Sequence, residues 1–281
     1  MSNRIEENIA RSAGSNFYYS FIMLPNEKKE NMMTVYAFCK VTDDIVDNEL
    51  DSEENKLEKI KEWREELQLA LNDKSKYELL NKLSLTIKRA NLSVQPFFDL
   101  IDGVEMDLTK KRYETFDELK IYCNKVASTI GIMSIEIFGY KNPLTIKYAE
   151  NLGIAMQLTN ILRDVKKDAM VGRIYIPQED MIKFNYSEKE LMKFNYNENF
   201  RKLMEFEFKR AKSFYREADK YLETEDRRIL AMGRAMELIY YYLLQKIRRK
   251  RYNVFEKEIK VSKFIKFSIT FSTLLKYYIV Y

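Results

Sequence analysis

Apolar residues recur at intervals of three and four along most of the chain, which is the spacing of an amphipathic helix. Between Ala149 and Val165 the apolar positions surround the helix on nearly every side, so we expect this helix to be buried. The pattern as a whole predicts long helices at 27–48, 53–72, 76–90, 94–109, 116–139, 143–168, 198–223 and 226–252, with a helical tail from about 260.

Capping signals mark several of the helix starts. Capping boxes are predicted at Ser75–Glu78, Thr115–Glu118 and Ser187–Glu190, and Pro143 after Asn142 is typical of a first helical turn. The least helical stretch is 171–177, which contains a glycine, β-branched residues and a proline. We expect an ordered loop there, directly after the buried helix.

Composition supports an all-helical fold. The 281 residues include only 7 Gly and 4 Pro, too few for the frequent turns of sandwiches and barrels. Hydrophobic residues at 46% and charged residues at 32% exclude a disordered chain and allow a large core. Because we find no linker, repeat or low-complexity tract, we expect residues 1–281 to form a single all-α domain.

The sequence contains no membrane-spanning segment. Lys266 and Lys276 interrupt even the apolar C-terminal tail, and the charged residues among the first eleven do not suit a signal peptide. We therefore expect a cytoplasmic protein.

The complete absence of histidine restricts the chemistry. Imidazole bases, Ser-His nucleophile pairs and His-ligated metals are all excluded. Cys39 and Cys123 both lie in apolar helical contexts, where we expect reduced, buried thiols. Any metal would be held by oxygen ligands, which favours magnesium, calcium or manganese.

Positive charge gathers at the C-terminal end. Residues 227–281 hold 13 Lys and Arg against 3 Asp and Glu, whereas the whole chain carries a net charge of +5. The apolar stretch 264–281 could lie on an anionic membrane as an interfacial segment, or could pack on the domain as a last helix. We expect no nucleic-acid partner, and a monomer or weak dimer.

A first candidate site is the string Asp43-Asp44-Ile-Val-Asp47. On a helix, Asp43 and Asp47 share one face, which continues an apolar stripe through Cys39, Tyr36 and Met32. Carboxylates facing inward would need a compensating cation, because unpaired buried charges are costly. The alternative is a solvated acidic face.

A second candidate site runs through the predicted buried helix. Gln157, Asn160, Asp164 and Asp168 form a polar row at spacings of three, four and four, flanked by Arg163. Their oxygens suit a hard cation such as magnesium, which usually adds phosphate oxygens to its ligands, and Arg163 could bind an anion. The alternative is a buried helix paired with a basic neighbour.

Two oxygen-ligand helices in an apolar helical protein indicate a particular chemistry. Magnesium ions between the two helices could bind a diphosphate and assist its departure, while apolar walls hold a hydrocarbon and keep water from the carbocation. The 17 Phe and 20 Tyr could supply aromatic faces that stabilise such a cation, although most will be ordinary core.

Several segments resemble the head-to-head trans-prenyl synthases, the squalene and phytoene synthase family. The likeness spans roughly 12–255, leaving 256–281 as a tail, and is most specific between Gln157 and Asp180. The segments that carry it are Gly14–Phe21, Tyr36–Asp47, Tyr122–Gly131, Asn151–Val165 and Gly172–Asp180. Gly14–Phe21, Glu105–Leu108 and Tyr252–Phe255 look most like the presqualene diphosphate synthases of bacterial hopanoid pathways.

The resemblance implies an isoprenoid synthase fold, with helices around a central apolar cavity, and a role for each candidate residue. Magnesium, or manganese, would bind Asp43, Asp47, Asn160, Asp164 and Asp168. Diphosphate oxygens would contact Lys40, Arg163, Arg173, Tyr240 and Arg248, and the reaction centre would be lined by Tyr36, Tyr122 and Gln157. Lys40 departs from the family, which usually has Arg there; the change loses a bidentate fork and keeps the charge.

The expected reaction joins two farnesyl diphosphates head to head into presqualene diphosphate. The proton that is lost would go to a tyrosine or to the released diphosphate, and this half-reaction needs no NADPH. The alternatives are phytoene or dehydrosqualene synthase and, on spacing alone, a terpene cyclase. A non-enzymatic helical lipid-binding protein at a membrane surface is the alternative from another class.

Overall fold

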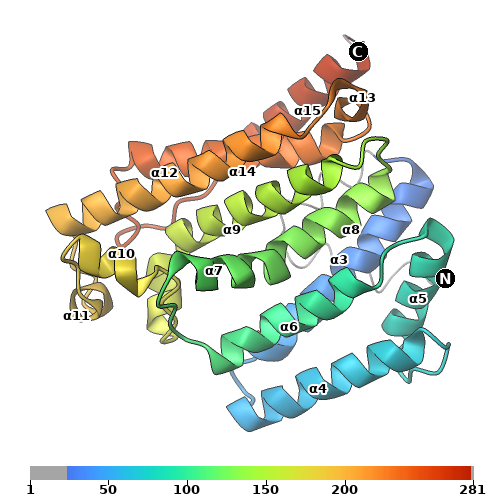
Figure 1. The fold of residues 1–281 in the computed structure, drawn as a ribbon, viewed down its shortest axis with the longest axis horizontal. Coiled ribbons are helices and arrows are strands. Elements are labelled where there is room, and N and C mark those ends of the chain that lie inside the picture. The colour runs from blue at the N-terminus through green and yellow to red at the C-terminus, as the bar shows by residue number, and fades with distance from the viewer. Residues whose placement is uncertain (1–23, 280–281) are drawn as a thin grey trace.

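A computed structural model of the protein describes residues 24–279 as a bundle of helices joined by short loops (Figure 1). The predicted all-α fold is confirmed: no strand forms within 24–279, where the structure has a single isolated β-bridge between Arg112 and Ile174. The first half of the bundle comprises α3 (Asn26–Asp47), α4 (Glu53–Ala70), α5 (Glu78–Ala90), α6 (Gln95–Thr109), α7 (Phe116–Cys123), the π-helical segment η1 (Asn124–Ser128) and α8 (Thr129–Phe138).

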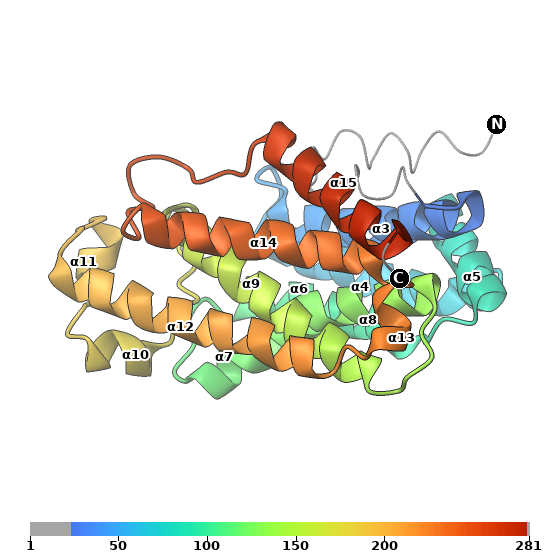
Figure 2. The ribbon, with the colours of Figure 1, turned by 90° about the horizontal axis from the view of Figure 1, so that it is seen from above.

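The central element is α9 (Thr145–Met170), which packs against η1, α8, α12 and α14. The consecutive residues Leu152, Gly153, Ile154 and Ala155, which point to four different sides of it, are all buried, as its all-round apolar pattern predicts. Around and after it lie α10 (Gln178–Lys183), α11 (Glu188–Met192), α12 (Glu198–Lys220), α13 (Thr224–Arg227), α14 (Ala231–Arg249) and α15 (Lys263–Ile279), seen from above in Figure 2.

Some predicted boundaries are wrong for local reasons. α5 begins at Glu78 and not at Ser75, because the Ser75 hydroxyl donates to Glu66 and accepts from the Tyr77 N–H. Pro143 precedes the first turn of α9, since Asn142 Oδ1 accepts from the Leu144 N–H and delays the helix to Thr145. The predicted helix 226–252 is divided into α13 and α14; the short helix α10 was not predicted, and of α11 only the start signal at Ser187 was.

Two other start signals have clear outcomes. Ser187 and Glu190 form the full reciprocal capping box predicted for them. Thr115 caps α7 by accepting from the Glu118 N–H, but the Glu118 carboxylate accepts from the Glu114 N–H and leaves that box incomplete.

The predicted helix 116–139 is continuous but contains the π-helical turn η1. This turn lies against α6 and α9. A Cβ on Gly153 of α9 would come within 2.5 Å of the Ser128 Cα, so the two backbones are in direct contact. π-Helical turns often occur at functional sites.

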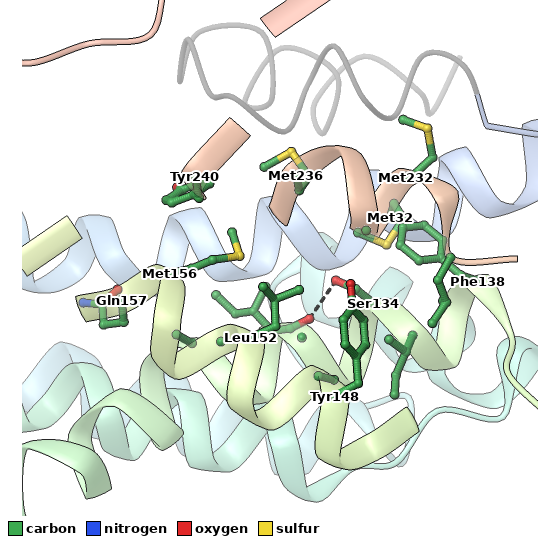
Figure 3. A pocket seen from close by; sticks show the side chains of 18 of the residues that line it. Met32, Ser134, Phe138, Tyr148, Leu152, Met156, Gln157, Met232, Met236 and Tyr240 are labelled. Atoms are coloured by element: carbon green, nitrogen blue, oxygen red, sulfur yellow. Dashed lines mark hydrogen bonds between the residues drawn. The ribbon is translucent and has the colours of Figure 1, made fainter. Parts of the chain in front are cut away.

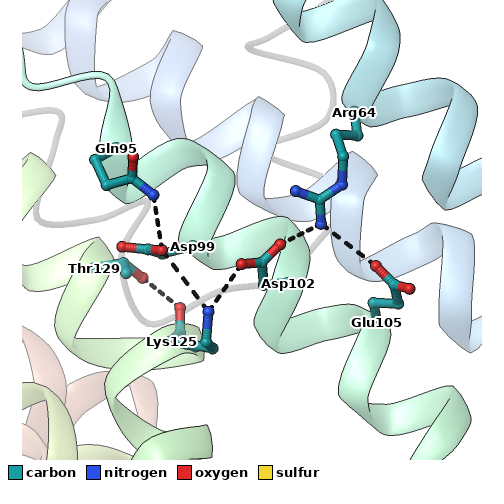
Figure 4. Close-up of polar contacts among 7 residues, drawn as sticks. All are labelled: Arg64, Gln95, Asp99, Asp102, Glu105, Lys125 and Thr129. Carbon is teal, nitrogen blue, oxygen red and sulfur yellow. Dashed lines mark hydrogen bonds and ion pairs between the residues drawn. The ribbon is translucent and has the colours of Figure 1, made fainter.

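Ion pairs join α4, α6 and η1 (Figure 4). Arg64 pairs with Asp102 and, at 3.3 Å, with Glu105, while Lys125 of η1 pairs with Asp102 at 2.8 Å. Each half-exposed pair contributes less than about 1 kcal/mol, but the linked set orients α6 relative to its neighbours. This orientation directs the opposite face of α6 towards the bundle interior.

A buried acidic pair connects α10 with α12. Arg210 Nη1 lies 2.6 Å from both Asp180 and Glu207, whose side chains are each 5% exposed. Burial raises the pKa of Glu207 above its usual 4.5; Arg210 opposes this rise, and the Asp180 carboxylate adds to it. Folded Glu207 therefore keeps a proton that the unfolded chain releases.

This retained proton predicts a pH dependence of stability. A group with a raised folded pKa stabilises the fold below its unfolded pKa, so the free energy of unfolding should fall as pH rises above about 5. Glu207→Gln should remove this contribution, so its free energy of unfolding should exceed that of wild type by about 1–2 kcal/mol near pH 8. Urea denaturation near pH 5 and near pH 8 would measure the difference. Glu205→Gln on the same helix, exposed and paired with Lys209, is the control. Parallel pH profiles for Glu207→Gln and wild type would contradict the assignment.

Candidate active site

The acidic end of α3 is more open than the sequence predicts. Met32 is buried and Tyr36 and Cys39 are half-buried, but the side chains of Asp43 and Asp47 are 53% and 52% exposed. The expectation that these carboxylates face the interior is therefore wrong. The stripe starts in the core and reaches the surface as the helix ends.

Like charges still crowd this end of α3. Partial burial and the charge of Asp47 raise the pKa of Asp43 to about 6. Lys40 Nζ pairs with Asp44 and lies 3.7 Å from Asp43. Lys40 therefore lies beside the acids of this helix, and Asp44 is occupied by this pair.

The polar row on α9 is half-buried, as expected. Asn160 Nδ2 donates to Gln157 Oε1 at 3.3 Å, whereas the buried Asn160 Oδ1 has no hydrogen-bond partner among the residues described. A buried amide oxygen left without a donor is costly. This oxygen is a ready ligand for a cation.

The next two turns of α9 carry the remaining acids of the row. Arg163 forms a forked pair with Asp164, its Nε lying 2.9 Å from Oδ1. Burial raises the pKa of Asp168 to about 8, and the neighbouring Asp164 charge contributes to the rise. The row thus brings two carboxylates together in a half-buried place, with Arg163 paired to one of them.

The loop after α9 connects the two acidic helices. The predicted ordered loop is confirmed: the Arg173 N–H donates to the Asp168 carbonyl at 2.8 Å, and the Ile174 N–H donates to the Lys111 carbonyl at 3.0 Å. From this anchored loop Arg173 Nη1 reaches Asp47 Oδ1 at 3.3 Å. Residues 126 positions apart thus meet at one site.

The donor set fits a divalent cation bound together with phosphate. Within 24–279 no group of three or more Cys, Asp or Glu side chains lies close enough together to hold one metal ion. Magnesium is usually held by one or two carboxylates plus water and substrate phosphates, so a closed protein cage is not required. The unpartnered Asn160 Oδ1 and the raised pKa values of Asp43 and Asp168 are what such an ion would compensate.

The sequence analysis missed Asp107, a buried acid beside this site. Its carboxylate accepts from the Tyr175 hydroxyl at 2.7 Å and the Tyr122 hydroxyl at 3.0 Å. Burial raises the pKa of Asp107, and the charge of Arg173 opposes the rise. The available signal was its position on an apolar face of α6, three and four residues after Val104 and Gly103.

A second missed residue is Lys266, which α15 presents to the site. It lies on the same face as the buried residues Thr270, Thr273 and Tyr277, so its side chain points towards the bundle. Burial lowers the pKa of Lys266, and repulsion from Arg163 lowers it further. The site therefore gathers cations as well as acids.

An apolar cavity of about 180 Å³ leads away from this cluster between α3, α8, α9 and α14 (Figure 3). Gln157 and Tyr240 lie at one end, and Phe138 and Met232 lie at the other. Asn160 also lines the cavity, so its polar end adjoins the acidic row. The predicted central apolar cavity is present.

Two predicted site residues do not line the cavity. Tyr122 lies beside the site, buried, with its hydroxyl donating to Asp107. Arg248 is exposed at the end of α14, where its guanidinium lies 5.4 Å from the ring centroid of Phe208 on α12. Since α12 packs on the Thr159 side of α9 and not on the polar row, Arg248 is not brought to the site. Gly14–Phe21, used above for the resemblance, lies outside the described residues.

Comparison with known proteins identifies the family. The family model described as squalene/phytoene synthase matches residues 10–264. The chain belongs to the squalene/phytoene synthase family. It is 36% identical to a phytoene synthase of Arthrospira platensis over 87% of this chain and 83% of that protein. A 15-cis-phytoene synthase of Synechococcus elongatus is 33% identical, with the same coverage.

Solved structures of this family have the same fold. A dehydrosqualene synthase superimposes with a TM-score of 0.84 at 29% identity, over 98% of this chain and 96% of the other. The squalene synthase HpnC of Alicyclobacillus acidocaldarius gives 0.81 at 25% identity, over 89% and 94%. The chain is thus a prenyltransferase-type enzyme with the all-α isoprenoid synthase fold, which excludes the non-enzymatic alternative.

Proposed function

We propose that the enzyme condenses two farnesyl diphosphates head to head into presqualene diphosphate with release of diphosphate. The observation that carries this proposal is the apolar cavity whose polar end adjoins clustered acids and cations. A prenyl chain fits the apolar part, and its diphosphate fits the charged end. The head-to-head reaction class is supported by the phytoene, dehydrosqualene and squalene synthases to which the chain is similar.

The charged residues would bind the diphosphates. Magnesium, held by Asp43 and Asp47 on α3 and by Asn160, Asp164 and Asp168 on α9, would neutralise the diphosphate and assist its departure. Lys40, Arg163 and Arg173 are now paired with aspartates and would exchange these partners for phosphate oxygens. Tyr240, which lies at the polar end of the cavity, would add a hydroxyl contact.

The cavity wall would protect the allylic cation from water. Its lining is almost entirely apolar, and Phe138, Tyr148 and Tyr240 present aromatic rings. The cation formed at C1 of the first chain would attack the double bond of the second, and loss of a proton would close the cyclopropane ring. Gln157 beside Asn160 would orient the reacting ends.

The released diphosphate would accept this proton, and Tyr122 and Tyr175 would not. Burial and the charge of Asp107 raise the pKa values of Tyr122 and Tyr175 far above the usual range, so both keep their hydroxyl protons. Tyr36 remains a candidate for contact with the reacting chain from its half-buried place on α3. No reductant is required, because NADPH would serve only a later half-reaction.

Cavity length supports a C15 substrate. Tyr148 and Asn160 both line the cavity and are separated by about 18 Å along α9. A fully extended farnesyl chain spans about 14 Å from its C–C bond lengths, and a geranylgeranyl chain spans about 19 Å. The distance along α9 is therefore longer than an extended farnesyl chain and slightly shorter than an extended geranylgeranyl chain, which supports the C15 substrate.

A second candidate is the condensation of two geranylgeranyl diphosphates, the first step to phytoene. It is favoured by the relatives, since the 36% and 33% identical proteins described above are phytoene synthases. Dehydrosqualene synthesis from farnesyl diphosphate is a further alternative, and it shares the proposed first step.

Product analysis tests the proposal directly. Purified protein with magnesium is incubated with farnesyl or geranylgeranyl diphosphate, with and without NADPH, and the products are identified by mass. We expect presqualene diphosphate from farnesyl diphosphate without NADPH, and no product when magnesium is chelated. Turnover of geranylgeranyl diphosphate alone would overturn the C15 assignment in favour of the phytoene route.

A further inference from the structure

α15 has two faces with different environments. One face packs on α14, where Thr270, Thr273 and Tyr277 are buried. Figure 2 shows α15 crossing α14 at the edge of the bundle, with its other side turned away from the remaining labelled helices. Of the two alternatives for the tail, packing on the domain as a last helix is therefore observed, but this packing accounts for only one face.

The outward face of α15 is a stripe of large apolar side chains. Phe264, Phe267, Phe271 and Leu275 follow at intervals of three and four and are 78%, 64%, 51% and 48% exposed. The rings of Phe267 and Phe271 stack at 6.0 Å. Single exposed apolar residues are common, but a contiguous exposed row on one helix indicates an interaction surface.

The charge on this helix selects the kind of partner. α15 carries Lys263, Lys266 and Lys276 and no acidic residue. Lys263 and Lys276 are exposed, and neither forms an ion pair with any residue in the described part of the chain. An anionic surface would satisfy both lysines while the phenyl rings enter an apolar layer.

We propose that this stripe, Phe264, Phe267, Phe271 and Leu275 with Lys263 and Lys276, is the surface by which the enzyme docks on an anionic lipid bilayer. An interfacial helix inserts its aromatic and leucine side chains at the headgroup boundary, and anionic lipid adds an attraction for each nearby lysine. The contact is peripheral, because no helix between residues 24 and 279 is long and apolar enough to cross a membrane. The inference is independent of which product the enzyme makes.

A second copy of the chain suits this surface less well. A two-fold dimer would place the same patch of both subunits together, so lysines without nearby acids would face one another. Docking on a bilayer also has a consequence for the substrate. α14, on which α15 lies, contributes Met232, Met236 and Tyr240 to the cavity, so the cavity wall would lie one helix away from the membrane.

Vesicle sedimentation of the full-length protein, without substrate, tests the surface. The vesicles are phosphatidylcholine alone or phosphatidylcholine with phosphatidylglycerol, at low and high salt. We expect wild type to bind the anionic vesicles, with binding weakened by salt. The triple variant Phe264→Gln, Phe267→Gln, Phe271→Gln should bind at least about tenfold less. Lys263→Gln with Lys276→Gln should lose most of the preference for anionic lipid.

Matched variants control for changes in surface composition. A control triple variant replaces comparably exposed apolar residues elsewhere on the surface: Leu50→Gln, Leu85→Gln and Ile182→Gln. This variant should bind the vesicles as wild type does. Turnover of detergent-dispersed farnesyl diphosphate should be unchanged in the Phe variant, which separates this inference from the proposed reaction. Equal vesicle binding by wild type and the Phe variant would overturn it. So would a wild-type dimer that the Phe substitutions dissociate and that does not bind vesicles.

Discussion

Asp164→Asn is expected to lower turnover of farnesyl diphosphate by about two to three orders of magnitude. Asp164 lies between Asn160 and Asp168 on the polar row, and it now holds the Arg163 guanidinium in a forked pair. Replacing its carboxylate with an amide removes a charged ligand for magnesium and weakens the orientation of Arg163. The loss should appear in steady-state kinetics at saturating magnesium.

The fold should survive this substitution, because Asn has the same shape and the side chain is partly solvated. Far-ultraviolet circular dichroism and the urea midpoint should match wild type. Asp219→Asn is the control, since Asp219 also pairs with an arginine, Arg234, but lies on α12 away from the row. Near-normal turnover in Asp164→Asn, or an equal loss in Asp219→Asn, would remove Asp164 from the site.

The main helices could be predicted because their apolar positions repeat with the helical period. α9 is the clearest example: its apolar residues surround the helix, so burial on every side was the only stable arrangement, and any polar residue on it had to face a site. Gln157, Asn160, Asp164 and Asp168 could thus be identified from spacing alone. Local capping was less reliable where a side chain had a tertiary partner, as Ser75 has in Glu66.

Contacts between distant segments could not be predicted from periodicity. The pattern placed Asp43 and Asp47 on the inward stripe of α3, but it could not show that this stripe reaches the surface before the helix ends. Likewise, Asp107 meets Tyr175, 68 positions further along the chain, only because α6 and the loop after α9 are packed together. The family resemblance placed Arg248 at the diphosphate, but its position at the end of α14 directs it to Phe208 and not to the acids.

Gly153→Ala is expected to lower the free energy of unfolding by about 3 kcal/mol, the upper end of the usual cost of overpacking. The new Cβ would lie 2.5 Å from the Cα and 2.6 Å from the N of Ser128, and 2.7 Å from the carbonyl carbon of Ala127. These are backbone atoms, so no rotamer change can relieve the overlap. The central helix would have to move away from the π-helical turn, and urea denaturation would measure the cost.

Gly233→Ala is the matched control on the other side of the cavity. Gly233 also lies in a helix and lines the cavity, but nothing lies within 4 Å of a Cβ placed there. Alanine should be neutral or stabilise α14 by up to about 1 kcal/mol through its better helix propensity. If both variants were equally stable, α9 and η1 would not be in the close contact described here. If only Gly153→Ala is destabilised, and turnover falls with it, the cavity depends on this backbone contact, because Ala127 and Gly153 form adjoining parts of its wall.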